Sequence, residues 1–305
     1  MPDSFGVAIV GAGAAGLATA IFAARRNPRL AIALLDGAKK PGAKILISGG
    51  GRCNVTNTVV AATDFHGGSR HVVRRILAAF TAEDAAAFFR DLGVPLHVEE
   101  DGKLFPDSGC ARTVLDALLA EARRLDVRLL TGHRVTGLSR GFALETSAGA
   151  LHAPHVVLAT GGLSLPKSGS DGTGHRLAAS LGHTIVPCTP ALAPLVLDGD
   201  FHVALSGVAH PVELVVRADR DKPARVRGAL LWTHFGVSGP AALDASRLWH
   251  RARIDGRAVA VHVSLLGAGT STPPSGRCST RRVRGRPRTC ETRSRRSCRP
   301  GSPTP

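Results

Sequence analysis

The sequence predicts an α/β protein in which helices cover a parallel sheet, joined to a smaller β-rich region. Strand-like and helix-like segments alternate up to about residue 190, and they open with a strand, a helix and a second strand within about thirty residues. From about residue 191 the pattern changes to short stretches of alternating apolar and polar residues, which favour antiparallel strands.

End signals and apolar periodicity place the individual elements. A helix is expected to begin after Thr81, because Asp84 three residues later completes a capping box, and to end at Gly93. Another helix is expected after Gly239-Pro240. The other expected helices cover 14–26 and 112–125, and the expected strands cover 7–10, 30–35, 127–130, 142–146, 155–159, 212–216 and 258–263.

Composition excludes several classes. With 305 residues the chain is long enough for two domains, and it contains no apolar run near eighteen residues, so no membrane span is expected. The N-terminus has no signal-peptide pattern, which favours a cytoplasmic protein. The six cysteines form no CxxC pair, so neither a metal site nor a disulfide framework is expected. The oligomeric state is left open.

The net charge of +16 would favour nucleic acid as a partner, but much of it lies at the C-terminal end. Residues 267–305 hold ten arginines and one acid, Glu291, with almost no aliphatic residues. We therefore expect a disordered tail, best explained by reading out of frame. The rival interpretation, a nucleic-acid-binding arm, is disfavoured because this segment has no aromatic residue to stack on bases.

The expected organisation is therefore a nucleotide-binding domain over 1–190, an inserted and incomplete β-rich substrate-side domain over 191–266, and the tail over 267–305. The first strand runs into Gly11-Ala-Gly13-Ala-Ala-Gly16, a GxGxxG motif that is followed by a helix. Asp36 ends the second strand. In this context the glycines allow close approach of a pyrophosphate, and the acid is placed to accept hydrogen bonds from a ribose. A merely glycine-rich turn is the alternative. The predicted dinucleotide-binding residues are Gly11, Gly13, Ala14, Ala15, Gly16 and Asp36.

Two further segments bear on the bound nucleotide, and the one over 156–162 favours FAD over NAD. The apolar strand over 156–159 ends in Thr160-Gly161-Gly162, as in many FAD-binding proteins of the Rossmann type, where such a strand follows a β-meander that we also expect here. An ordinary buried strand with a glycine turn is the alternative. The loop Lys44 to Asn57 contains three consecutive glycines, which let backbone amides approach an anion or a ring.

This loop also carries a family resemblance. The run K-x-L-x-S-G-G-G-R-C-N-x-T-N, together with Gly102-Lys-Leu-Phe-Pro106 and Thr233-His-Phe-Gly236, resembles the BaiN/YhiN-like (aminoacetone-oxidase-like) NAD(P)/FAD-dependent oxidoreductases. The similar motifs cover most of residues 5–245. The chain departs from the family pattern at Gly228-Ala-Leu and at Asp171-Gly-Thr-Gly-His175.

The resemblance implies a flavoprotein oxidoreductase that transfers hydride or electrons between FAD and either NAD(P)H or a small organic substrate of unknown identity. It also implies that family members continue past this chain and return to the FAD domain, so a truncated, inactive remnant is the alternative. Beyond the glycine motif, the resemblance implies cofactor contacts from Lys44, Ser48, Gly49, Gly50, Arg52, Cys53, Asn54, Val135, Thr160, Gly161 and Gly162.

Two residues are candidates for catalysis. Cys53 follows the glycine loop and could face the flavin, but no adjacent base favours a thiolate, and a packing role is the alternative. His234 is a candidate acid or base, with a structural histidine as the alternative.

Overall fold

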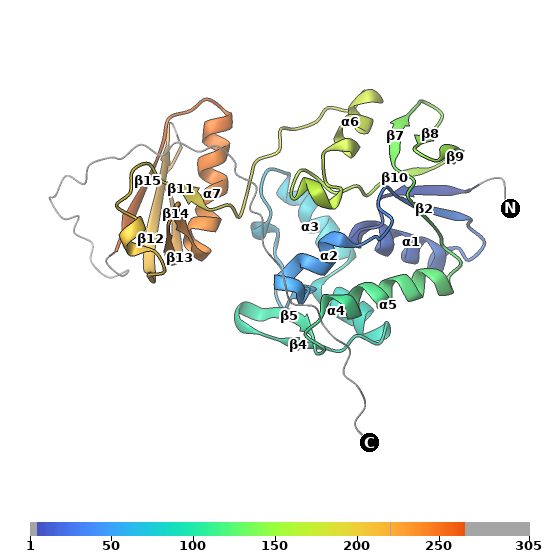
Figure 1. Cartoon of the computed structure of the whole chain (residues 1–305), viewed down its shortest axis with the longest axis horizontal. Helices are drawn as coiled ribbons and strands as arrows, with labels where there is room; N and C mark the ends of the chain where they lie inside the picture. Colours follow the sequence, from blue (N-terminus) through green and yellow to red (C-terminus); the bar gives the residue numbers. More distant parts are fainter. Residues whose placement is uncertain (1–4, 220, 266–305) are drawn as a thin grey trace, which may run out of the picture. The chain divides into compact units, whose positions relative to one another are not determined.

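The computed structural model describes residues 5–219 and 221–265. These residues form two compact units, one ending at Ile185 and one beginning at Val186. The units appear in Figure 1 in blue to yellow-green and in yellow to orange. Each unit has its own buried apolar cluster. The predicted out-of-frame tail over 267–305 lies outside the described residues.

A four-stranded parallel sheet with the order β10-β1-β2-β6 forms the centre of the first unit. β1 is buried along its whole length, and β2 is buried up to Leu35, as expected for a parallel sheet covered on both faces. This confirms the predicted α/β class. The strands are β1 (Val7–Val10), β2 (Ile32–Asp36), β6 (Arg128–Thr131) and β10 (Val156–Leu158).

Successive side chains of β1 point to opposite faces of this sheet and so join two different cores. Val7 and Ile9 pack in one cluster with residues of α1 (Ala14–Arg26), α4 (Ala82–Asp91) and α5 (Ala111–Arg124). Ala8 and Val10 pack on the other face with an antiparallel meander and α6. The elements on this second face are β7 (Val135–Leu138), β8 (Ala143–Thr146), β9 (Gly149–His152) and α6 (Thr173–Ser180). The expected β-meander is therefore present.

The capping box at α4 is present as predicted. Thr81 Oγ1 accepts a hydrogen bond from the Asp84 amide at 3.1 Å, and Asp84 Oδ2 accepts one from the Thr81 amide at 2.8 Å. The chain leaves the helix through Gly93, which has a φ of +76°. The capping box at the start and the glycine after the end thus mark the limits of this helix.

A second, small sheet with the order β3-β5-β4 was not expected from the sequence. Its strands have two to four residues, which is too short for an alternating pattern to be recognised. α3 was also missed, and none of its residues is buried. The elements of this region are α2 (Ala43–Ile47), β3 (Thr56–Asn57), α3 (Arg70–Ala79), β4 (Leu96–Val98) and β5 (Lys103–Pro106).

The described residues of the second unit form a five-stranded antiparallel sheet with the order β11-β14-β13-β12-β15 and one long helix. The helix starts at the predicted Gly239-Pro240, and it buries Ala241, Ala245 and Trp249 in the cluster shared with the sheet. The elements are β11 (Leu195–Val196), β12 (Ala209–Ala218), β13 (Ala224–Thr233), β14 (Gly236–Ser238), α7 (Gly239–Ile254) and β15 (Val259–Ser264).

The described helices include none that is both long enough and apolar enough to pass through a bilayer. This agrees with the absence of a long apolar run in the sequence.

A buried carboxylate joins α1 to α5. The Glu121 side chain is only 8% exposed, and its carboxylate accepts hydrogen bonds from Arg25 Nη2 at 2.7 Å and from Arg124 Nε at 2.6 Å. The hydrogen bond from Arg124, supported by the one from Arg25, lowers the pKa of Glu121 from 4.5 to about 2. The charged form is therefore the one that stabilises the packing of these two helices.

The ion pairs of Glu121 with Arg25 and Arg124 give a pH-dependent contribution to stability. Because the pKa of Glu121 is lower in the folded chain, its contribution is present above pH 4.5 and is lost as the pH falls toward 2. We expect Glu121→Gln to lower the free energy of unfolding by about 1–3 kcal/mol at pH 7 and by much less near pH 2.5. Urea unfolding at both pH values measures the difference. Glu83→Gln, at a side chain that is 77% exposed, is the control. An equal loss at both pH values would contradict this assignment.

Candidate functional site

A cavity of about 1120 Å³ opens in the first unit beside the end of β1. Cofactor pockets commonly measure roughly 300–1,000 Å³, so this one could hold a large ligand. Its walls come from the β1–α1 turn, the end of β2, the segment 40–55 and the loop after β10. The sequence-predicted residues that line it are Gly11, Gly13, Ala14, Ala15, Asp36, Lys44, Ser48, Cys53, Asn54, Val135, Thr160 and Gly161.

Two glycines of the β1–α1 turn are required by the fold itself. Gly11 has a φ of +106°, and a Cβ there would lie 2.5 Å from the carbonyl oxygen of Ala159. A Cβ at Gly16 would lie 1.8 Å from the carbonyl oxygen of Gly11. Since backbone atoms cannot yield as a side chain can, these positions admit only glycine while the turn, β10 and α1 stay packed together.

Gly13 differs from these two glycines. Its φ of −84° suits any residue, and a Cβ added there would meet no atom within 4 Å. Nothing within the described chain therefore requires glycine at this lining position. Gly13 is also the N-cap of α1, and no side chain caps that helix, so the first turn leaves backbone amides available to an outside acceptor. A pyrophosphate fits this arrangement, since it is an anion that needs close backbone approach.

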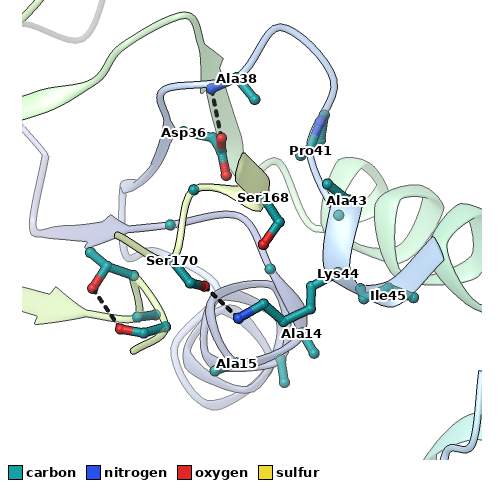
Figure 2. Close-up of a pocket in the computed structure, with 18 of the residues that line it drawn as sticks. Ala14, Ala15, Asp36, Ala38, Pro41, Ala43, Lys44, Ile45, Ser168 and Ser170 are labelled. Atoms are coloured by element: carbon teal, nitrogen blue, oxygen red, sulfur yellow. Dashed lines mark hydrogen bonds between the residues drawn. The ribbon is translucent and has the colours of Figure 1, made fainter. Parts of the chain in front are cut away.

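Asp36 connects the end of β2 to this turn. Its Oδ1 accepts a hydrogen bond from the Ala38 amide at 2.8 Å (Figure 2). Its Oδ2 accepts one from the Ala12 amide, also at 2.8 Å. The two bonds fix the carboxylate at the cavity wall and leave lone pairs on both oxygens. Asp36 therefore lines the cavity with free acceptor capacity, and its contact with a ribose stays a prediction.

Lys44 also lines the cavity and brings a basic side chain to it. Its Nζ donates to Ser170 Oγ at 2.5 Å (Figure 2). It also donates to the Ser164 carbonyl at 2.9 Å. Burial lowers the pKa of Lys44. The same serine explains Gly161, where φ is +74° and a Cβ would lie 2.3 Å from Ser170 Oγ. Lys44, Gly161 and Ser170 thus fix the path of the loop after β10.

An ion pair at the cavity wall was not predicted from the sequence. Asp171 accepts hydrogen bonds from Arg134 and from Thr173 Oγ1. The Thr173 hydroxyl, followed by the Arg134 guanidinium, holds the pKa of Asp171 well below its ordinary value. Asp171 lies in the segment where the chain departs from the family pattern. That departure was the available signal, but Arg134 precedes β7 without any motif of its own.

Aromatic residues form a further part of the wall that sequence reasoning missed. Phe22 lies 5.0 Å from Phe88 and 5.4 Å from Phe80, measured between ring centroids, and Phe89 lies 5.2 Å from Phe88. All four line the cavity. They come from α1, the C-cap of α3 and α4, so only the fold brings them together.

Five predicted contact residues are not among those that line the cavity: Gly16, Gly49, Gly50, Arg52 and Gly162. Gly16 supports the turn from inside. Arg52 instead pairs with Glu99 and covers the ring of Phe105, at the side of a second hollow formed by these residues with Glu100 and Lys103.

The two catalytic candidates have different surroundings. Cys53 is buried in the cavity wall, and burial raises the pKa of its thiol, partly offset by a hydrogen bond with Ser48. This favours a neutral thiol, which suits the packing alternative better than a thiolate nucleophile. His234 belongs to the second unit, between β13 and β14, where its carbonyl faces His202 Nε2 at 3.2 Å. It is not a lining residue of the cavity.

The fold is that of an α/β protein with a Rossmann-type domain, and the cavity opens at the end of its first strand. Residues 5–279 match the model of the HI0933-like protein Rossmann domain, and the chain belongs to this family. The family predicted from the motifs is thereby confirmed.

Curated relatives agree with this assignment. The chain is 33% identical over 263 residues to a 3-dehydro-bile acid delta(4,6)-reductase of Clostridium scindens, which covers 85% of this chain and 64% of the relative. It is 34% identical over 253 residues to the ribosomal RNA dihydrouridine synthase of Escherichia coli, and this match covers 81% of this chain and 62% of the relative. The ribosomal RNA dihydrouridine synthase of Haemophilus influenzae is 32% identical over 250 residues, and this match covers 79% of this chain and 61% of the relative. The chain thus spans less than two thirds of the length of these relatives.

The open space at Gly13 leads to a direct test. We expect Gly13→Val to fold as the unchanged chain does, because its side chain meets no protein atom, and to weaken FAD binding at least about tenfold, which corresponds to 1.4 kcal/mol. FAD titration followed by flavin fluorescence measures affinity, and urea unfolding measures stability. Gly68→Val is the matched control, since that position is also open and does not line the cavity. Equal FAD affinity in Gly13→Val and the unchanged chain would refute a pyrophosphate at this turn.

Proposed function

We propose that this chain is the FAD-binding part of a flavin-dependent reductase. The observation that carries the proposal is the open position at Gly13, at the uncapped start of α1, with the fixed carboxylate of Asp36 on the same cavity wall. When bound, FAD supplies two-electron hydride chemistry. Family membership and the named relatives support the assignment.

In this proposal the chain's own residues bind and orient the cofactor. Amides at the start of α1 hold the pyrophosphate, and Asp36 accepts hydrogen bonds from the ribose. Ser48, Cys53 and Asn54 form the wall nearer the flavin ring. Because Cys53 is buried with a raised thiol pKa, we assign it to the wall and not to covalent catalysis. The aromatic wall excludes water from part of the cavity.

We further propose the kind of bond that is reduced. The names of the relatives describe a delta(4,6)-reductase acting on a 3-dehydro-bile acid and synthases that make dihydrouridine in ribosomal RNA. In chemical terms, each name implies saturation of a carbon–carbon double bond conjugated with a carbonyl group. The proposed reaction adds one hydride and one proton across such a bond, and NAD(P)H is the proposed source of the hydride.

Anaerobic reduction tests this function. The chain is loaded with FAD and mixed with NADPH or NADH, and we expect the oxidised-flavin absorbance to disappear. Adding a 3-oxo-4,6-diene steroid or a uridine-containing RNA then restores the absorbance if that compound is an acceptor. A matching saturated steroid and an RNA without uridine are the controls. FAD that stays oxidised with both nucleotides, or reduced FAD that neither acceptor reoxidises, would contradict the proposed reaction while leaving FAD binding intact.

A further inference from the structure

Arg52 follows the three consecutive glycines, yet its side chain is held by the β4–β5 hairpin. Its guanidinium lies over the Phe105 ring, 4.1 Å from the centroid, and Nη1 donates to Glu99 Oε1 at 2.5 Å. Phe105 belongs to β5, and Glu99 follows β4. A cation stacked on an aromatic ring and bonded to a carboxylate is fixed from two directions.

The carboxylate that receives Arg52 is itself held. His97 Nε2 lies 3.3 Å from Glu99 Oε1, and His97 Nδ1 lies 3.1 Å from Asp107 Oδ1. The hydrogen bond from Arg52, supported by His97, keeps the pKa of Glu99 below its ordinary value. Asp107, His97, Glu99 and Arg52 thus form a chain of alternating charge sign when His97 is protonated. Such networks stabilise more than isolated surface pairs.

The β4–β5 hairpin also packs against the glycine-containing segment 48–54. Phe105 is buried, and a Cβ at Gly49 would lie 2.8 Å from its Cε1 and 2.7 Å from the Asn54 amide nitrogen. The segment therefore rests directly on the ring. Its backbone is left-handed at Gly49, Gly50 and Cys53, and at the cysteine this conformation costs free energy. A segment in this state needs contacts that hold it in place.

We propose that Arg52 and Glu99 are positioning residues that clamp the segment 48–54 to the β4–β5 hairpin. The clamp keeps Ser48, Cys53 and Asn54 in the cavity wall, while Arg52 itself does not line the cavity. This assignment differs from the expectation from the family resemblance, in which Arg52 contacts the bound cofactor. Its effect on FAD rests on the proposed function, but its effect on the segment does not.

Hydrogen exchange of the FAD-free chain tests the clamp without any cofactor. The amides of Arg52 and Cys53 bond to the carbonyls of Gly49 and Ser48, so their exchange reports on the segment. We expect Glu99→Ala and Arg52→Ala each to speed exchange in the peptide 48–54 about threefold, the size expected for a surface charge network. Arg52→Lys restores only part of the protection, because lysine lacks the planar group that stacks on Phe105.

The control is the ion pair between Glu83 and Arg90 on α4, which is also exposed and has the same 2.5 Å separation. Glu83→Ala is expected to leave exchange over 48–54 unchanged. Exchange that stays at the wild-type rate in both Glu99→Ala and Arg52→Ala would overturn the clamp, as would an equal increase in Glu83→Ala.

FAD titration of the same variants distinguishes the clamp from direct contact. If the clamp acts on the cofactor, Glu99→Ala and Arg52→Ala each weaken FAD binding by about threefold, and the double variant is no weaker than either one. A loss in Arg52→Ala alone would instead identify Arg52 as a ligand and overturn the positioning role. If the unchanged chain binds no FAD, the proposed function fails, while hydrogen exchange still decides the clamp.

Discussion

The close approach of the β1–α1 turn to α1 is the constraint on which the rest of the first unit depends. Gly16 sits so near the Gly11 carbonyl that even one methyl group would collide with it. This contact sets where α1 begins relative to the sheet, and the bond from the Ala12 amide to Asp36 ties the same turn to the end of β2. The cavity forms because the β1–α1 turn, the start of α1 and the end of β2 are held in fixed positions relative to one another.

The cavity combines two kinds of wall with different physical roles. One wall offers the unfilled position at Gly13, the uncapped start of α1 and the carboxylate of Asp36, which together suit a phosphate and a ribose. The other is apolar and aromatic, which suits a flat ring system. Between them, Lys44 fixes the loop after β10 through Ser170.

The segment 48–54 shows how a site of this kind is supported from outside. Its left-handed residues let the segment follow the cavity wall, but this backbone conformation is not stable by itself and needs contacts from elsewhere. Contacts on the opposite side, through Arg52 to Glu99 and Phe105, connect it to a hairpin that does not itself surround the main cavity. A glycine-rich loop can thus be both open to a ligand and fixed in shape.

The sequence predicted the features that depend on local chemistry. The turn from Gly11 to Gly16, Asp36 at the end of β2 and the capping box at Thr81 all follow from short-range rules. The sequence could not predict which groups from distant segments meet. Arg134 with Asp171, and Phe22 with Phe88, are joined only by the folded chain. The resemblance implies that Arg52 contacts the cofactor, whereas in the folded chain its guanidinium lies against Glu99 and Phe105, because a sequence motif does not reveal side-chain direction.

The most direct test of the account is a crystal structure of this chain with FAD bound. The account predicts density for the pyrophosphate over the start of α1, with phosphate oxygens about 3 Å from backbone amides near Gly13, and a ribose hydroxyl within the same distance of Asp36. FAD bound elsewhere, or lying in the cavity with its pyrophosphate away from the β1–α1 turn, would contradict it.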